Sequence, residues 1–198
     1  MGYVGLLLSG AALFLNSLML SGKAEAKSVA VFNLFVGILQ VVIPFYLIMV
    51  SDQGNWIVYE YAATFLFGLT YLYVGFTFLK GMSGTGLGWF SIWVTVISIF
   101  YAVVSLWHSQ DYVSALTWLM WAFLWFLFFA LNAWGKPLEQ FTSKVAFVQS
   151  WVTLTIPSLL YFIGVWSDEL VQLIWLIVLS LSALYFIYEA LKIKKAIA

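Results

Sequence analysis

Polar and aromatic side chains recur at helical spacing within stretches of the chain that are otherwise apolar. Their amide and hydroxyl groups can exchange hydrogen bonds, and their indole and phenol rings offer flat apolar faces together with N–H or O–H donors. Such groups suit weak contacts with a small polar solute rather than nucleophilic or metal chemistry. The residues are Ser9 and Asn16 in one stretch, with Leu13 between them on the same helical face, Phe67 and Tyr71 in a second, Trp118, Trp121 and Trp125 in a third, and Gln149, followed by Thr153, in a fourth.

The composition places these residues in a membrane. The chain has 198 residues, of which 65% are apolar, 20% aromatic and only 8% charged, whereas a soluble domain carries roughly 25% charged residues. This excludes a soluble enzyme and a disordered chain, and the absence of a basic patch excludes a nucleic-acid partner. The chain has no cysteine and one histidine, so neither a disulfide framework nor a metal site is expected.

Charged residues divide the chain into seven apolar windows, each of a length that can cross a bilayer core, for which about 20 helical residues are needed. We therefore expect an all-α polytopic membrane protein, a compact bundle of seven transmembrane helices that forms a single channel domain over residues 1–198. Gly81 to Gly88 are expected to form a loop, and Pro157 is expected to kink the sixth helix. The predicted helices cover about 3–21, 28–50, 56–79, 88–107, 112–134, 145–166 and 170–190.

The lysines predict the orientation of the bundle. All eight basic residues are lysines, and a seven-helix model puts every one of them, including Lys144, in loops or tails on one side. The opposite loops carry Asp52, Asp111 and Asp168 instead. The positive-inside rule then predicts a cytoplasmic C-terminus and an external N-terminus.

The depth of the singled-out residues favours a passage. Trp125 lies about 13 residues into its helix, or about 20 Å at 1.5 Å per residue, which is too deep for a tryptophan of the membrane interface. Asn16, Tyr71 and Gln149 also fall in the inner half of their helices. We expect a narrow passage with aromatic walls, in which indole N–H groups serve as donors and a small, neutral, planar solute can pass. Helix packing remains the alternative interpretation of each residue, because Ser, Thr and Asn often bridge membrane helices, and Asn33 and Gln40 are expected to do so.

Five segments resemble the AmiS/UreI family of urea and short-chain amide channels, and the resemblance covers about residues 1–166. They are the Leu13–Asn16 end of the first helix, Lys27–Gly37, Phe67–Tyr73, Trp118–Trp125, and Pro137–Thr142 followed by Ile156–Pro157. The resemblance implies passive permeation of urea or acetamide through a bacterial cytoplasmic membrane. It implies a homohexamer in which each protomer has its own pore and needs no cofactor. Leu13, Phe67, Tyr71, Trp121 and Trp125 would line the constrictions, with Ser9 and Trp118 further out and Asn16 towards the cytoplasm.

Two departures from the acid-gated members of that family bear on gating. Gln149 stands where those members carry a carboxylate, and glutamine cannot titrate. The outer loops are short, and His108 is the only histidine, whereas a switch near neutral pH needs several such groups. We therefore expect a channel that is open at neutral pH. The seventh helix is an addition relative to those members.

Other functions fit the sequence less well than a channel. A retinal photoreceptor would need a buried lysine in the last helix, and a membrane enzyme would need a nucleophile–base pair or metal ligands in one layer; the spans contain neither. A secondary carrier of a small polar solute is the remaining alternative, although no internal repeat or mid-span carboxylate supports it.

Overall fold

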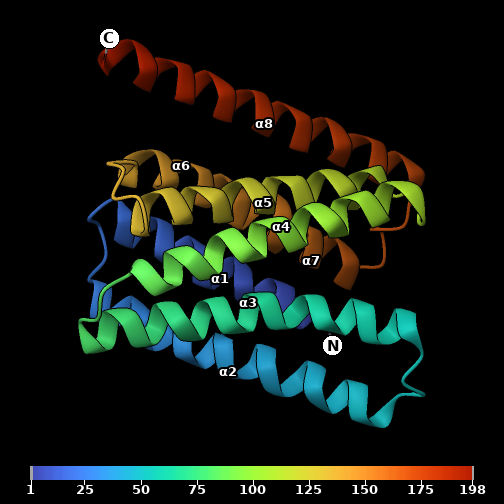
Figure 1. Cartoon of the computed structure of the whole chain (residues 1–198). Helices are drawn as coiled ribbons and strands as arrows, with labels where there is room; N and C mark the ends of the chain where they lie inside the picture. Colours follow the sequence, from blue (N-terminus) through green and yellow to red (C-terminus); the bar gives the residue numbers. More distant parts are fainter. Residues whose placement is uncertain (1, 198) are drawn as a thin grey trace.

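The computed structural model describes residues 2–197, and these residues form a bundle of long apolar helices (Figure 1). Seven helical spans are long and apolar enough to cross a membrane, which confirms the predicted fold class. The elements are α1 (Gly2–Leu20), α2 (Ala26–Val50), α3 (Asn55–Lys80), α4 (Thr85–Trp107), α5 (Tyr112–Asn132), α6 (Glu139–Gln149), η1 (Ser150–Thr155), α7 (Ile156–Phe162) and α8 (Glu169–Ile197). α6, η1 and α7 follow one another without a break and form one span.

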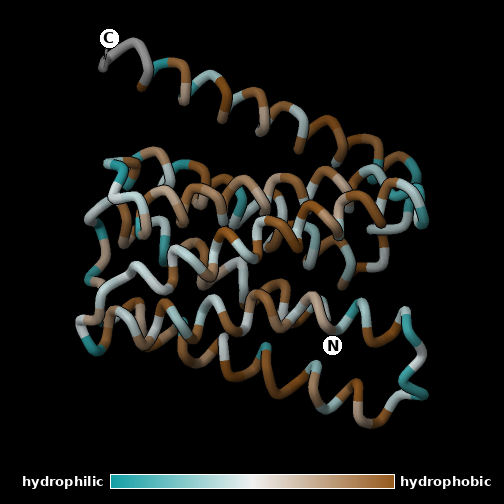
Figure 2. Tube along the Cα trace, viewed as in Figure 1, coloured by the Kyte–Doolittle hydropathy of each residue, from teal (hydrophilic) through white to brown (hydrophobic). Residues whose placement is uncertain are grey.

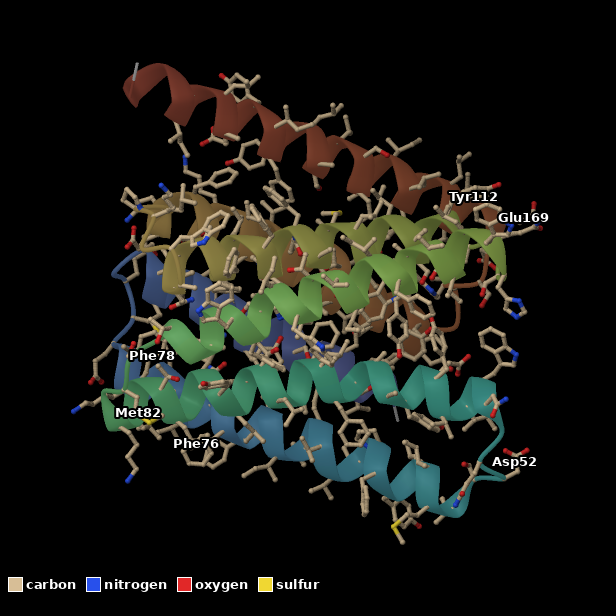
Figure 3. All side chains as sticks on the ribbon, viewed as in Figure 1. Asp52, Phe76, Phe78, Met82, Tyr112 and Glu169 are labelled. Atoms are coloured by element: carbon tan, nitrogen blue, oxygen red, sulfur yellow. The ribbon has the colours of Figure 1, made fainter. Side chains whose placement is uncertain are left out.

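Short connections join the spans at two opposite ends of the bundle, and hydrophilic residues concentrate there (Figure 2). The acidic end carries Asp52 and Glu169, and the opposite end, called the lysine end below, includes Met82 next to the connection between α3 and α4 (Figure 3). At the acidic end, the Asp111 carboxylate caps α5 by accepting a hydrogen bond from the Ser114 backbone N–H at 2.8 Å. α1, α3 and α5 all run from the acidic end to the lysine end.

Two helix pairs build the bundle around α1. α2 packs along α3 and α4 along α5, while α1 lies between these pairs and contacts α6 and η1. Glycines permit the close approach of α2 and α3: a Cβ on Gly37 would lie 2.8 Å from the backbone nitrogen of Leu72 and 2.9 Å from the carbonyl oxygen of Gly68. Small residues at such contacts let membrane helices pack backbone to backbone.

The fourth helix begins earlier than predicted. α4 starts at Thr85 rather than near 88, so Gly86 and Gly88 are helical and not part of a loop. Glycine is needed at position 88 for packing, because a Cβ there would lie 2.7 Å from the backbone nitrogen of Ala133. The glycine-rich composition therefore reflects close contact with the end of α5.

The sixth span is displaced from its predicted limits of 145–166 and covers Glu139–Phe162. It begins at Glu139, two residues after Pro137, and Glu139 lies in the first turn, where a negative charge is favourable. It ends before Gly164, whose φ of 78° is left-handed. Lys144, predicted in the preceding loop, lies inside α6 and forms an ion pair with Glu189 of α8.

Pro157 perturbs this span by a change of helix type. The six residues of η1 just before it are π-helical, and the Ile156 N–H donates to the Trp151 carbonyl five residues back. The next donor in this pattern would be the N–H of residue 157, which proline lacks. The Val152 carbonyl instead accepts a hydrogen bond from the Trp175 indole of α8 at 2.9 Å.

α8 is the least buried span and diverges from the bundle towards the C-terminus (Figure 1). It contacts α5, α6 and η1. Glu189 joins it to α6 near the lysine end through Lys144, and the same carboxylate also pairs within α8 with Lys192, whose Nζ lies 3.3 Å from it. An apolar gap of about 440 Å³ remains between α5 and α8. α8 continues to Ile197, beyond the predicted end near residue 190.

Candidate functional site

The candidate site is a series of cavities enclosed mainly by α1, α3 and α5. The side chains that border them repeat every three or four residues along each helix, so each helix contributes one face. Towards the acidic end lie two cavities of about 250 Å³ and 120 Å³. Towards the lysine end lies a smaller one of about 30 Å³, which has room for a water molecule.

The two outer cavities share Leu6, Trp118 and Trp121. The larger outer cavity also reaches Thr153 and Pro157 of the sixth span and Asp111 at the acidic end, and the smaller one reaches Ser9 and Gln40. The small inner cavity is bordered by Leu13, Asn16, Phe67, Thr70, Tyr71, Val74, Trp121, Leu124, Trp125 and Phe128. None of these ten inner side chains is charged.

Aromatic rings separate the inner cavity from the outer ones. The Phe67 ring centre lies 4.8 Å from that of Trp121 and 5.0 Å from that of Trp125. Trp118 stands edge-on to Trp121 at 4.8 Å on the outer side. Phe67 and Trp121 border cavities on both sides, so these two rings form the constriction between them.

The indole N–H groups at this constriction are already hydrogen-bonded. Trp121 Nε1 donates to Thr153 Oγ1 at 2.9 Å, and Trp125 Nε1 donates to Thr70 Oγ1 at 3.2 Å. The expectation that these indoles act as free donors is therefore wrong. Sequence reasoning did not single out Thr70, although it lies three residues after Phe67 and so on the same helical face.

Tyr71 and Gln40, near the constriction, are hydrogen-bonded to the backbone of α1. Tyr71 donates its hydroxyl to the Ser9 carbonyl at 3.2 Å. Gln40 of α2 donates to the Gly5 carbonyl at 2.7 Å and also to the Ser9 hydroxyl. The prediction that Gln40 bridges helices is confirmed, while its position beside the smaller outer cavity was not anticipated.

Asn16, at the lysine end of the inner cavity, is paired with Asn33 of α2. The two carboxamides exchange hydrogen bonds of 2.9 Å and 2.7 Å, and Asn33 is completely buried. The predicted bridging role of Asn33 is confirmed. Any solute that reaches Asn16 meets an amide that already has an amide partner.

Gln149 occupies a different environment from the other predicted site residues. Its side chain is completely buried and donates to the Met120 carbonyl at 2.8 Å. Its Oε1 has no hydrogen-bond partner among the described residues. Gln149 does not border any of the three cavities, whereas the other eight predicted site residues each border at least one.

The seven spans and the internal cavities with aromatic walls are those of a polytopic membrane protein. The family model of the AmiS/UreI family transporters matches residues 1–165. The chain therefore belongs to the AmiS/UreI family. α8 lies entirely beyond the matched residues.

Three bacterial relatives are similar along most of their length. Transporter protein AmiS2, so named in Rhodococcus erythropolis, is 42% identical over 165 residues, which cover 83% of this chain and 80% of that protein. A protein named as a transporter of amidate substrates in Mycolicibacterium smegmatis is 36% identical, covering 84% and 79%. The Helicobacter pylori urea channel, solved in a closed state by cryo-electron microscopy, has 30% identity and a TM-score of 0.76, covering 82% of this chain and 98% of that one.

Proposed function

We propose that this protein is a passive channel for small neutral amides such as urea and acetamide, and that the path runs between α1, α3 and α5. The observation that carries the proposal is the alignment of cavities on both sides of an aromatic constriction. The names of the relatives, which include amidate substrates and urea, agree with this solute class. Ser9, Leu13, Asn16, Phe67, Tyr71, Trp118, Trp121 and Trp125 would line the path, and Gln149 would support it from behind α5.

In the proposed mechanism, the solute is hydrated in the outer cavities and is selected at the aromatic constriction. A solute enters the outer cavities, loses water at Phe67 and Trp121, and stacks its planar face against the rings. A hydrated ion is excluded because no charged group in the inner cavity compensates for the water it would lose. The inner cavity holds about one water-sized molecule, so passage requires Phe67 or an indole ring to move aside.

We further propose that the channel conducts at neutral pH without acid activation. Asp111 is the one ionisable carboxyl among the residues that border the three cavities. His108 is exposed at the acidic end, where its ring stacks on Trp56 at 4.0 Å, away from the constriction. The Helicobacter pylori relative is named an acid-activated urea channel, so this property would distinguish the two proteins.

Orientation and assembly are part of the same proposal. Because Lys23, Lys80 and Lys136 lie at one end and Asp52 and Asp111 at the other, the lysine end would face the cytoplasm. The protein would sit in a bacterial cytoplasmic membrane as a ring of six protomers, each with its own path, as the family resemblance implies. Native mass spectrometry of the detergent-extracted protein tests the hexamer.

The test of the function is solute flux into proteoliposomes followed by stopped-flow light scattering. A channel gives rapid urea and acetamide entry that needs no ion gradient and rises linearly with solute concentration. A secondary carrier of a small polar solute, the alternative function, gives a rate that saturates. Flux no greater than in protein-free liposomes would contradict both.

A further inference from the structure

We propose that Thr70 and Thr153 are positioning residues that hold the two indole rings beside the solute path and thereby set its selectivity. This inference rests on the proposed channel function, because it names what fixes the shape of that site. Thr70 is on α3 and Thr153 is on η1. The two threonines thus come from separate elements, and each accepts a hydrogen bond from an indole of α5, which carries Trp121 and Trp125.

The direction of each hydrogen bond is determined by the indole N–H, which can only donate, and the threonine's other contact shows where its own proton goes. Thr70 Oγ1 lies 2.6 Å from the Leu66 carbonyl oxygen, and Thr153 Oγ1 lies 2.7 Å from the Gln149 carbonyl oxygen. A hydroxyl has one proton, and in both residues it is donated to the carbonyl four residues back. Each hydroxyl can therefore only accept from its indole, and each Trp–Thr–carbonyl chain has one polarity.

Burial gives these bonds their orienting effect. Thr70, Thr153, Trp121 and Trp125 are each no more than 8% exposed. An indole N–H that turned away from its threonine in such surroundings would lose its only partner, which is unfavourable. Each ring is therefore held with its N–H directed at a threonine of another element. Its carbon face or edge is directed towards Phe67.

The consequence concerns what a solute meets at the constriction. With both N–H groups occupied, the rings present apolar surface, and the solute is not retained by indole donors. Loss of a threonine acceptor would let the ring rotate so that its N–H points into the path. The rotated ring would narrow the constriction and would slow bulkier amides more than urea.

Thr70→Val tests this with almost no change of shape, because valine replaces the hydroxyl by a methyl group. We expect the ratio of propionamide to urea permeability to fall about fivefold, the effect of one buried hydrogen bond. Thr70→Ser retains the acceptor and should retain the ratio. Thr95→Val is the matched control: Thr95 is buried, and its hydroxyl lies 2.9 Å from the Ser91 carbonyl four residues back and 3.4 Å from the Ala122 carbonyl of α5. No indole among the described residues donates to Thr95.

A double-mutant cycle distinguishes a positioning role from direct contact with the solute. If Thr70 acts through Trp125, Thr70→Val should have no further effect on the ratio in a Trp125→Phe background, since phenylalanine has no N–H. An equal change in both backgrounds would overturn the proposal in favour of direct contact. An unchanged ratio in Thr70→Val would overturn it outright.

Fluorine NMR of protein labelled with fluorotryptophan provides a readout that does not depend on transport. The Trp125 resonance is identified by its disappearance in Trp125→Phe; we expect it to shift in Thr70→Val and not in Thr70→Ser.

Absence of wild-type flux would refute the channel function but not this orienting bond. An unmoved resonance with normal wild-type flux would refute the orienting bond alone. If Thr70→Val does not fold, the same test is made on a separate element, by following the Trp121 resonance in Thr153→Val.

Discussion

Replacing Trp125 by alanine should change which amides pass. The Trp125 ring is 5% exposed, borders the inner cavity and packs against Phe67. Its removal would enlarge a cavity of about 30 Å³ at the narrowest part of the proposed path. Larger amides that the wild-type rings exclude by steric overlap should then pass more easily than before.

The magnitude follows from the cost of forcing extra methylene groups into a packed site, which is about 1–3 kcal/mol. Relief of about 1.4 kcal/mol corresponds to a tenfold change in a rate ratio. We therefore expect the permeability of butyramide relative to acetamide to rise about tenfold in Trp125→Ala. The truncation should also lower stability by about 3–5 kcal/mol, so flux must be normalised to folded protein.

The control is Trp134→Ala. Trp134 is 55% exposed, lies after α5 near the lysine end, packs on Phe129 and borders none of the three cavities. The assay is stopped-flow swelling of proteoliposomes for a series of amides of increasing length. Equal changes in the two variants would refute the assignment of Trp125 to the solute path.

Three further predictions concern gating and packing. Urea flux should agree within about twofold between about pH 5 and about pH 7.5, because no group of histidines faces the cavities; a tenfold rise at the lower pH would contradict this. Asn33→Leu leaves the buried Asn16 amide without its partner and should destabilise the protein by about 1–3 kcal/mol. The measurement is the midpoint of thermal unfolding in detergent, which should fall; an unchanged midpoint would show that the Asn16–Asn33 pair contributes nothing to stability. Trp175→Phe removes the donor to the Val152 carbonyl and should cost about 1 kcal/mol, whereas Trp107→Phe, at an 86% exposed position, should leave the midpoint unchanged.

Much of the fold could be predicted from the sequence because charge and apolar surface are so strongly segregated. Aspartates such as Asp52 and Asp111 interrupt the apolar windows only where the chain turns. Lys144 is the exception, since its charge predicts a loop residue although it lies in α6. Its partner Glu189 is 45 residues away, and such pairing cannot be read from local composition.

The candidate site was predictable as a set of helical faces but not as a network. Spacing placed Phe67 beside Tyr71 and Trp121 beside Trp125, because residues three or four apart share a face. The partners of the indoles could not be found in this way, since Thr70 and Trp125 are 55 residues apart. The π-helical turn before Pro157 contains Thr153, and its Val152 carbonyl accepts from the Trp175 indole of α8, 23 residues away, which local sequence does not indicate either.

The most direct test of the central claim uses the fact that the chain contains no cysteine. Val74→Cys would place a single thiol at the inner cavity and Thr117→Cys one at the larger outer cavity, whereas Phe76→Cys would place it on an exposed position of α3. Each variant is treated with a small, polar thiol reagent, and acetamide flux is measured before and after. We predict that modification blocks flux in Val74→Cys and Thr117→Cys, that excess acetamide slows the block, and that Phe76→Cys is unaffected. Full flux after complete modification of both cavity thiols would contradict a solute path between α1, α3 and α5.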